Sequence, residues 1–203
     1  MPKIVIINYG MGNIRNVQRG IERTGSEALV VSKREEIKDA DGIVLPGVGA
    51  FRDAITNLSP LNQAICEKVE SEIPLLGICL GLQLLFTEST EGGVHKGLDI
   101  LKGRILRLPK GLKIPQIGWN TFTIVDPKNP LVKDLSNNSY AYFVHSYYAK
   151  LDNEDDVVAV TNYGIDFASI VSRKNVFATQ FHPEKSGKTG LKILKNFVDL
   201  IKK

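Results

Sequence analysis

Residues 74–86 read Pro74-Leu75-Leu76-Gly77-Ile78-Cys79-Leu80-Gly81-Leu82-Gln83-Leu84-Leu85-Phe86, and the interpretation of the whole chain depends on them. A short apolar run, a cysteine between two glycines and a second apolar run of helical length are typical of a strand, a sharp turn and a helix. Such a turn strains the backbone of its central residue, so the neighbouring residues must be small. The pattern therefore predicts that Cys79 stands at a nucleophile elbow between Gly77 and Gly81.

The predicted elbow has a chemical consequence for the cysteine. It aims the N-terminus of the following helix at the sulfur, and the positive end of the helix dipole favours a thiolate over a thiol. Free cysteines are also common as small core residues, so the elbow alone leaves a structural role for Cys79 open. For Cys66, which lies among Ala64, Ile65 and Val69 at helical spacing, a core role is the simpler interpretation.

A second stretch supplies the base that a cysteine nucleophile needs. Residues 179–184 read Thr-Gln-Phe-His-Pro-Glu. Residues two apart in an extended chain point the same way, so His182 and Glu184 are expected to face one site, with Pro183 keeping the chain extended. Cys79, His182 and Glu184 then act as nucleophile, base and orienting carboxylate.

The other two histidines are poorer candidates for the base. His95 stands next to Lys96 in an expected loop, and His145 has no adjacent carboxylate, although it could line the site. No two of the candidate residues have the spacing of zinc ligands, so no metal is predicted.

The first half of the chain alternates strands with helices. Strands are expected at residues 3–8, 28–31, 41–45 and 74–78, and helices at 13–25, 35–40 and in two segments broken near 59–60. This alternation predicts an α/β fold with a doubly wound, mostly parallel central sheet flanked by helices. Ligands in such sheets bind beyond the carboxyl ends of the strands, where residues 8–12, residues 46–49 and Cys79 would meet.

From Glu88 onward, the sequence no longer alternates predicted strands with long helices. Strands expected at 102–108, 120–125 and 140–144 have no long helices between them, which suggests a smaller antiparallel layer. Further strands are expected at 157–161, 168–172 and 176–181, with a hairpin turn at 173–175. The last helix starts near Gly187, and its expected apolar stripe is Leu191, Leu194, Val198 and Ile201. With no internal repeat or low-complexity linker, residues 1–203 are interpreted as one domain.

Composition excludes several classes of function. The net charge of +4 is mild, and the C-terminal lysines have no interleaved aromatic residues, so a solvated helix face fits better than a nucleic-acid site. No apolar run reaches membrane-spanning length. Two cysteines and no signal peptide predict a cytoplasmic location. Gly10 and Gly12 lack the third glycine of a dinucleotide fingerprint, because Arg15 stands there, so a tight turn is favoured and no cofactor is predicted.

The two motifs together resemble a known family. Gly77-Ile78-Cys79-Leu80-Gly81 with His182-Pro183-Glu184 is similar to the class I glutamine amidotransferases of the triad type. Other stretches resemble, within that class, the glutaminase subunits of imidazole glycerol phosphate synthase, which act in histidine biosynthesis; these stretches are residues 8–13, 46–51, 118–120, 143–147 and 180–186. The resemblance covers essentially the whole chain.

The resemblance implies a reaction and a partner. Glutamine would be hydrolysed through a thioester on Cys79, and the ammonia would pass to a separate (β/α)₈-barrel synthase/cyclase subunit in a heterodimer. Asn13, Asn16, Trp119, Asn120 and Lys185 are candidate contacts with that subunit. For Trp119 the sequence leaves core packing equally open, although tryptophan is enriched at interfaces.

Substrate contacts are also implied. The Leu80 N–H group, at the start of the elbow helix, is expected to donate to the oxyanion. By resemblance, the second donor lies in the Gly47-Val48 peptide. Gln83, Gly49 and the Ser146-Tyr147 backbone are expected to hold glutamine, and Gln83 lies one helical turn beyond Cys79.

Three alternatives remain from the sequence. The first is the glutaminase of another ammonia-using synthase, such as pyridoxal phosphate synthase, although that family resembles Gly-Gly-Glu-Ser after the position of Leu45. The second is a cysteine hydrolase that acts alone. The third is a binding module with a dead site, which the intact Cys79, His182 and Glu184 oppose.

Overall fold

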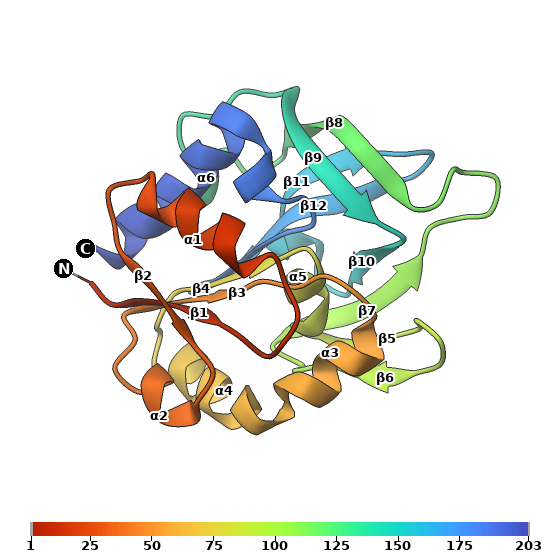
Figure 1. The fold of residues 1–203 in the computed structure, drawn as a ribbon. Helices are drawn as coiled ribbons and strands as arrows, with labels where there is room; N and C mark the ends of the chain where they lie inside the picture. The colour runs from red at the N-terminus through yellow and green to blue at the C-terminus, as the bar shows by residue number, and fades with distance from the viewer. Residues whose placement is uncertain (1, 203) are drawn as a thin grey trace.

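A computed structural model describes residues 2–202 (Figure 1). The first part of the chain alternates strands and helices as predicted: β1 (Ile4–Ile7), α1 (Ile14–Glu22), β2 (Ala28–Val31), α2 (Arg34–Ile37), β3 (Gly42–Leu45), α3 (Phe51–Leu58), the 3₁₀ turn η1 (Ser59–Leu61), α4 (Asn62–Glu70), β4 (Leu75–Ile78) and α5 (Leu80–Leu84). No helix within residues 2–202 combines the length and the apolar character needed to cross a membrane.

The second part is mainly strands: β5 (Phe86–Ser89), β6 (His95–Lys96), β7 (Leu101–Arg107), β8 (Gln116–Ile124), η2 (Pro130–Val132), β9 (Ser139–His145), β10 (Tyr147–Leu151), η3 (Glu154–Asp156), β11 (Val157–Asn162), β12 (Asp166–Arg173), β13 (Val176–Thr179), η4 (Pro183–Lys185) and α6 (Gly187–Ile201). The predicted hairpin between β12 and β13 is confirmed, because these strands pair antiparallel around Lys174.

One large sheet forms the centre of the molecule, in the order β2-β1-β3-β4-β13-β12-β11-β8-β9. The pairings from β2 to β13 are parallel, and those from β13 to β9 are antiparallel. Helices α1 and α6 cover one face, whereas α2 to α5 lie on the other (Figure 1). The strand β1 shows why its sequence is apolar throughout: Ile4 and Ile6 face one core, and Val5 and Ile7 face the other.

A smaller sheet packs beside the large one, in the order β10-β7-β5-β6. The predicted α/β fold with a second, smaller layer is therefore confirmed. The layer is not wholly antiparallel as predicted, because β5 and β7 pair parallel, and the prediction for two of its strands is wrong. Residues 120–125 and 140–144 belong largely to β8 and β9, which extend the large sheet. Strand β8 joins the large sheet because it pairs with β11, and β9 joins through its pairing with β8. Of the three predicted strands, only the one at 102–108 lies in the smaller sheet.

The helix after the elbow is shorter than the apolar run predicts. Helix α5 ends at Leu84, and Phe86 already begins β5. The segment 98–101 ends the helix from outside, because the Leu98 N–H group donates to the Leu84 carbonyl at 2.8 Å and Ile100 donates to the Leu85 carbonyl at 2.9 Å. These tertiary hydrogen bonds replace the ones that a longer helix would make.

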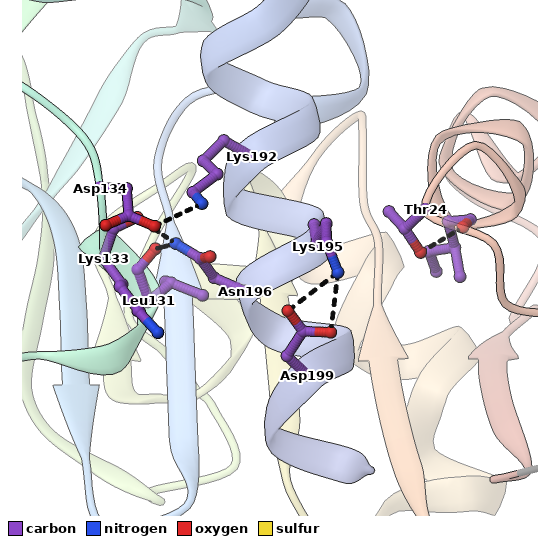
Figure 2. A network of polar contacts seen from close by, with 9 residues as sticks. Thr24, Leu131, Lys133, Asp134, Lys192, Lys195, Asn196 and Asp199 are labelled. Carbon is purple, nitrogen blue, oxygen red and sulfur yellow. Dashed lines mark hydrogen bonds and ion pairs between the residues drawn. The ribbon is translucent and has the colours of Figure 1, made fainter.

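Helix α6 is held against the turn η2 by polar contacts (Figure 2). The buried Asn196 donates from Nδ2 to the carbonyls of Leu131 and Lys133, at 2.9 and 2.8 Å. Lys192 Nζ lies 2.7 Å from an Asp134 carboxylate oxygen. Asn196 thus supplies hydrogen-bond donors to the backbone carbonyls of Leu131 and Lys133, and these contacts fix the rotation of α6 about its axis.

Three predicted core positions are less buried than expected, and one of them, Ile201 on α6, is only partly buried. Leu191 on α6 is 37% exposed, because the buried stripe is rotated toward Gly190, Ile193 and Phe197. A Cβ atom on Gly190 would lie 1.8 Å from the Pro183 carbonyl oxygen, so the helix must present this residue inward. Cys66 on α4 is only partly buried, so its predicted core role is wrong.

Close backbone packing at the elbow gives a first prediction. A Cβ atom on Gly81 would lie 1.8 Å from the Leu45 carbonyl oxygen, which cannot rotate away. Gly81→Ala should therefore lower the free energy of unfolding by about 3 kcal/mol, measured by urea denaturation. The control is Gly20→Ala, whose Cβ would meet the end of the Leu194 side chain at 2.7 Å, which can shift, and Glu184 atoms only at ordinary contact distances of 3.6 and 3.8 Å. Equal stabilities of the two variants would contradict this account of the elbow.

Candidate active site

The backbone at Cys79 forms the predicted elbow between β4 and α5. Its dihedral angles are φ 55° and ψ −107°, which a non-glycine residue rarely adopts. The Cys79 N–H group donates to the Thr179 carbonyl at 2.7 Å, which ties the elbow to the end of β13. A Cβ atom on Gly77 would lie 3.0 Å from the Gly81 carbonyl oxygen, so the need for small neighbours has a direct steric cause.

His182 and Glu184 form the second half of the site. His182 Nδ1 lies 2.8 Å from Glu184 Oε1, and the two side chains are 3% and 0% exposed. The predicted extended conformation is wrong, because Pro183–Lys185 form the 3₁₀ turn η4 and this turn brings the carboxylate back to the imidazole. The Ser186 hydroxyl stabilises the turn by donating to the His182 carbonyl at 2.6 Å.

Electrostatic interactions and hydrogen bonds link the side chains of Cys79, His182 and Glu184. Burial alone would lower the pKa of His182, but hydrogen bonds to Cys79 and Glu184 outweigh burial and raise this pKa to about 10. The imidazole is therefore protonated at neutral pH, which favours a thiolate next to it. Glu184 Oε2 is buried and has no hydrogen-bond partner within residues 2–202, so the imidazolium is the group that compensates the carboxylate charge.

The loop after β3 packs against the start of α5. A Cβ atom on Gly47 would lie 2.8 Å from both the Gly81 nitrogen and the Leu80 Cβ atom. The hydroxyl of the buried Tyr9 donates to the Pro46 carbonyl at 2.8 Å, which anchors the base of this loop. The predicted oxyanion donors at Leu80 and the Gly47-Val48 peptide are therefore neighbours, although their role stays a prediction.

A cavity of about 290 Å³ opens above the elbow. It brings together Cys79 and His182 with the residues predicted to hold glutamine, and its lining includes Val48, Gly49, Gln83, Ser146 and Tyr147. Two charged residues, Glu91 and Lys185, also line it. Sequence reasoning missed Glu91, because it lies in an irregular loop without a motif.

The predicted contact residue Gln83 is already engaged with the protein. Its Nε2 atom donates to the Tyr147 carbonyl at 3.2 Å and to Gln180 Oε1 at 3.4 Å. Both N–H groups are thereby used, so only its carbonyl oxygen remains for a ligand. Gln180 lies within a quoted motif, but sequence reasoning gave it no role.

His145 supports the wall of the cavity. Its Nδ1 atom lies 2.8 Å from the Tyr147 carbonyl oxygen, and its Nε2 atom lies 3.0 Å from Gln116 Oε1. Burial lowers the pKa of His145 to about 4, so the ring is neutral at pH 7. Because a carbonyl only accepts, Nδ1 carries the proton and holds the Tyr147 backbone in place. Nε2 is then an acceptor, so the Gln116 amide turns its NH₂ group toward the ring.

The candidate partner contacts lie in two regions. Trp119 on β8 is 56% exposed, which excludes core packing, and it meets Tyr142 edge to face at 5.8 Å. Lys185 Nζ lies 5.9 Å from the centre of the same Tyr142 ring. Asn120 donates to the Asn162 carbonyl at 3.0 Å. The other two candidates, Asn13 and Asn16, lie at the start of α1, where the Asn13 side chain makes no capping hydrogen bond.

The family model for glutamine amidotransferase class-I matches residues 5–201. The chain therefore belongs to the class I glutamine amidotransferase family, and curated relatives place it within the HisH branch of that family. It is 54% identical to imidazole glycerol phosphate synthase subunit HisH of Methanosarcina acetivorans, over 98% of this chain and 100% of that one. It is 51% identical to the same subunit of Caldanaerobacter subterraneus subsp. tengcongensis, over 98% of each.

A solved structure supports the fold. The structure of PurLQS from Thermotoga maritima matches with a TM-score of 0.80 at 19% identity, over 98% of both chains. At this identity the likeness concerns the arrangement of strands and helices, which agrees with the predicted fold class.

The neutral, buried His145 gives a prediction about pH. The unfolded chain binds a proton to this ring near pH 6.5, whereas the folded chain does so only near pH 4. Above pH 6.5 the ring is neutral in both states. Between pH 6.5 and 4 the unfolded state gains the proton first, so the ring lowers the free energy of unfolding by up to about 3 kcal/mol.

His145→Gln removes this titration and keeps a donor for the Tyr147 carbonyl. The stability of the unchanged chain should therefore fall relative to the variant as the pH drops from 6.5 to 4, measured by denaturation at each pH. Parallel stability curves over this range would show that the fold does not keep His145 neutral.

Proposed function

We propose that the chain is the glutaminase subunit of an imidazole glycerol phosphate synthase, with residues 1–203 forming one glutaminase domain. The observation that carries the proposal is the cavity that joins a strained Cys79 to the His182–Glu184 pair. The 54% identity to a protein named as this subunit supports the particular synthase. Glutamine is the substrate, and the ammonia it yields serves histidine biosynthesis.

Hydrolysis follows from the roles of the three side chains. The Cys79 thiolate attacks the side-chain amide carbon of glutamine, and the C–S bond forms as negative charge moves to the amide oxygen. The Leu80 N–H group and the Gly47-Val48 peptide donate to this oxygen. His182 protonates the nitrogen, the C–N bond breaks, and ammonia leaves a thioester. His182 then takes a proton from water, which attacks the thioester and releases glutamate and the Cys79 thiolate.

The cavity also offers partners for the rest of the substrate. Glu91 and Lys185 provide opposite charges at its wall, which match the ammonium and carboxylate groups of an amino acid. The free oxygen of Gln83 and the backbone of Gly49, Ser146 and Tyr147 complete the contacts with glutamine. The pair of opposite charges favours a free amino acid over a peptide as the substrate.

The partner is a (β/α)₈-barrel synthase/cyclase subunit, which forms a heterodimer with this chain. Its contacts include Asn13, Asn16, Trp119, Asn120 and Lys185. Exposed Trp119, Ile117 and Tyr140 on β8 and β9 support an interface there, because large exposed apolar side chains mark docking surfaces. Lys185 both lines the cavity and contacts Tyr142, so the interface would adjoin the site that releases ammonia.

We further propose a cytoplasmic location and no nucleic-acid or membrane partner. Both cysteines are free thiols, and a catalytic thiol is preserved in a reducing compartment.

The division of labour between the subunits gives a test of the function. Cys79→Ser should keep the fold and abolish glutamine hydrolysis, because serine lacks the acidic thiol. Cys79→Ala mixed with the barrel subunit should still form product from added ammonium salts and fail with glutamine. The measurement is product formation with each nitrogen source, and a failure of ammonium to rescue the variant would place Cys79 in the synthase step itself.

The proposed oxyanion loop gives a second test. Val48 lies between two glycines, and Gly47 has no Cβ atom to restrict rotation on its side of the peptide, so the Gly47-Val48 peptide can take two orientations of which one serves the oxyanion. If the partner and its ligand favour that orientation, ammonia release should rise from the free chain to the complex and again with ligand, by about 10²–10³ in total. Equal turnover in all three would show that the oxyanion site is permanently formed.

A further inference from the structure

A continuous chain of buried hydrogen bonds ends at the sulfur of Cys79. Gln83 Nε2 donates to the Tyr147 carbonyl at 3.2 Å and to Gln180 Oε1 at 3.4 Å. Gln180 Nε2 in turn donates to the Cys79 sulfur over 3.8 Å. Gln83 and Gln180 are 5% and 0% exposed, so the protein rather than solvent determines how their amides point.

The donor and acceptor roles in this series of hydrogen bonds are fixed by the Tyr147 carbonyl, where the series begins. A backbone carbonyl can only accept, so Gln83 must turn its NH₂ group toward Tyr147. The second N–H group of Gln83 then needs an acceptor, and Gln180 must present its oxygen there and its NH₂ group to the sulfur. A flipped Gln180 would set two donors against each other and point an oxygen at the sulfur. His145 Nδ1 donates to the same Tyr147 carbonyl at 2.8 Å and keeps it in place.

The Cys79 sulfur lies between one group that favours the protonated thiol and one that favours the thiolate. The Val144 carbonyl oxygen, 3.5 Å from the sulfur, is an acceptor and can bond only to the protonated thiol. The Gln180 N–H group is a donor, and its hydrogen bond strengthens when the sulfur becomes negative. Gln180 therefore favours the same thiolate as His182, but without a charge and without exchanging a proton.

We propose that Gln180 is a further catalytic residue, whose side-chain NH₂ group donates a hydrogen bond to the Cys79 thiolate in an orientation fixed by Gln83 and the Tyr147 carbonyl. Gln83 is then a positioning residue for Gln180 as well as part of the cavity wall. The hydrogen bond acts twice in the reaction. It stabilises the attacking thiolate, and it stabilises the same thiolate again as the leaving group when water cleaves the C–S bond of the thioester. The inference rests on the proposed role of Cys79 as nucleophile.

Other ionisable groups near the sulfur must stay unchanged in a test. They come from every element around the site: His182 and Glu184 before and within η4, His145 at the end of β9, Tyr9 in the loop after β1, and Glu91 and Lys185 at the cavity wall. Substituting only the two buried glutamines leaves all of them in place.

The test is the pH profile of Cys79 alkylation by iodoacetamide, read by peptide mass spectrometry of the purified chain. Gln180→Met keeps the side-chain length and removes the donor, so the midpoint of the profile should rise by about one pH unit, a tenfold change in the thiol–thiolate equilibrium. Gln180→Glu should raise it further, because a carboxylate repels the thiolate. Gln83→Met, which only releases the orientation of Gln180, should give a smaller rise.

Cys66 is the internal control, since it lies on α4 and its alkylation profile should not move in any variant. If Gln180→Met fails to fold in thermal unfolding, Gln180→Glu and Gln83→Met carry the same test. Unchanged Cys79 midpoints in the folded variants would overturn the proposal and leave Gln180 as a packing residue. If Cys79 is not the nucleophile, the unchanged chain already gives a different result. Its Cys79 would then be alkylated no faster than Cys66 at neutral pH, which would overturn both this proposal and the proposed function.

Discussion

The strained backbone of Cys79 is the constraint on which the site depends. A φ of 55° is unfavourable for cysteine and persists only because the surroundings hold it. The hydrogen bond to the Thr179 carbonyl fixes the elbow to β13, and the contact between Gly81 and the Leu45 carbonyl fixes the next helical turn to β3. Since β3, β4 and β13 are parallel neighbours, their carboxyl ends bring the loop at Gly47, Cys79 and His182 to one edge of the sheet.

Two buried histidines show how local partners decide charge at that edge. Burial by itself acts to lower the pKa of both rings, but the net shift differs because the two rings have different hydrogen-bond partners. His182 contacts a carboxylate and a thiol and remains protonated, whereas His145 contacts a carbonyl and an amide and becomes neutral. The first ring therefore carries a proton beside Cys79, whereas the second is neutral and holds the Tyr147 backbone at the cavity wall.

The sequence was sufficient to predict the parallel half of the fold and the sharp elbow at Cys79, because both depend on local patterns: apolar runs at regular spacing and glycines beside a cysteine. It failed where tertiary contacts override those patterns. The segment 98–101 cuts short the helix after Cys79, and β11 draws β8 and β9 into the large sheet. The turn at Pro183–Lys185, rather than strand alternation, brings Glu184 to His182. Glu91 and Gln180 could not be assigned, because their positions follow from the fold and not from spacing along the chain.

The proposed mechanism requires that the Cys79 thiolate attacks glutamine beside a protonated His182. The most direct test is rapid acid quenching of the chain during turnover, with its barrel partner present, followed by mass spectrometry of the cysteine peptides. A glutamyl thioester should form on the peptide that contains Cys79, and none should form when His182 is replaced by alanine. A thioester on Cys66, or glutamine turnover with no thioester at all, would contradict it.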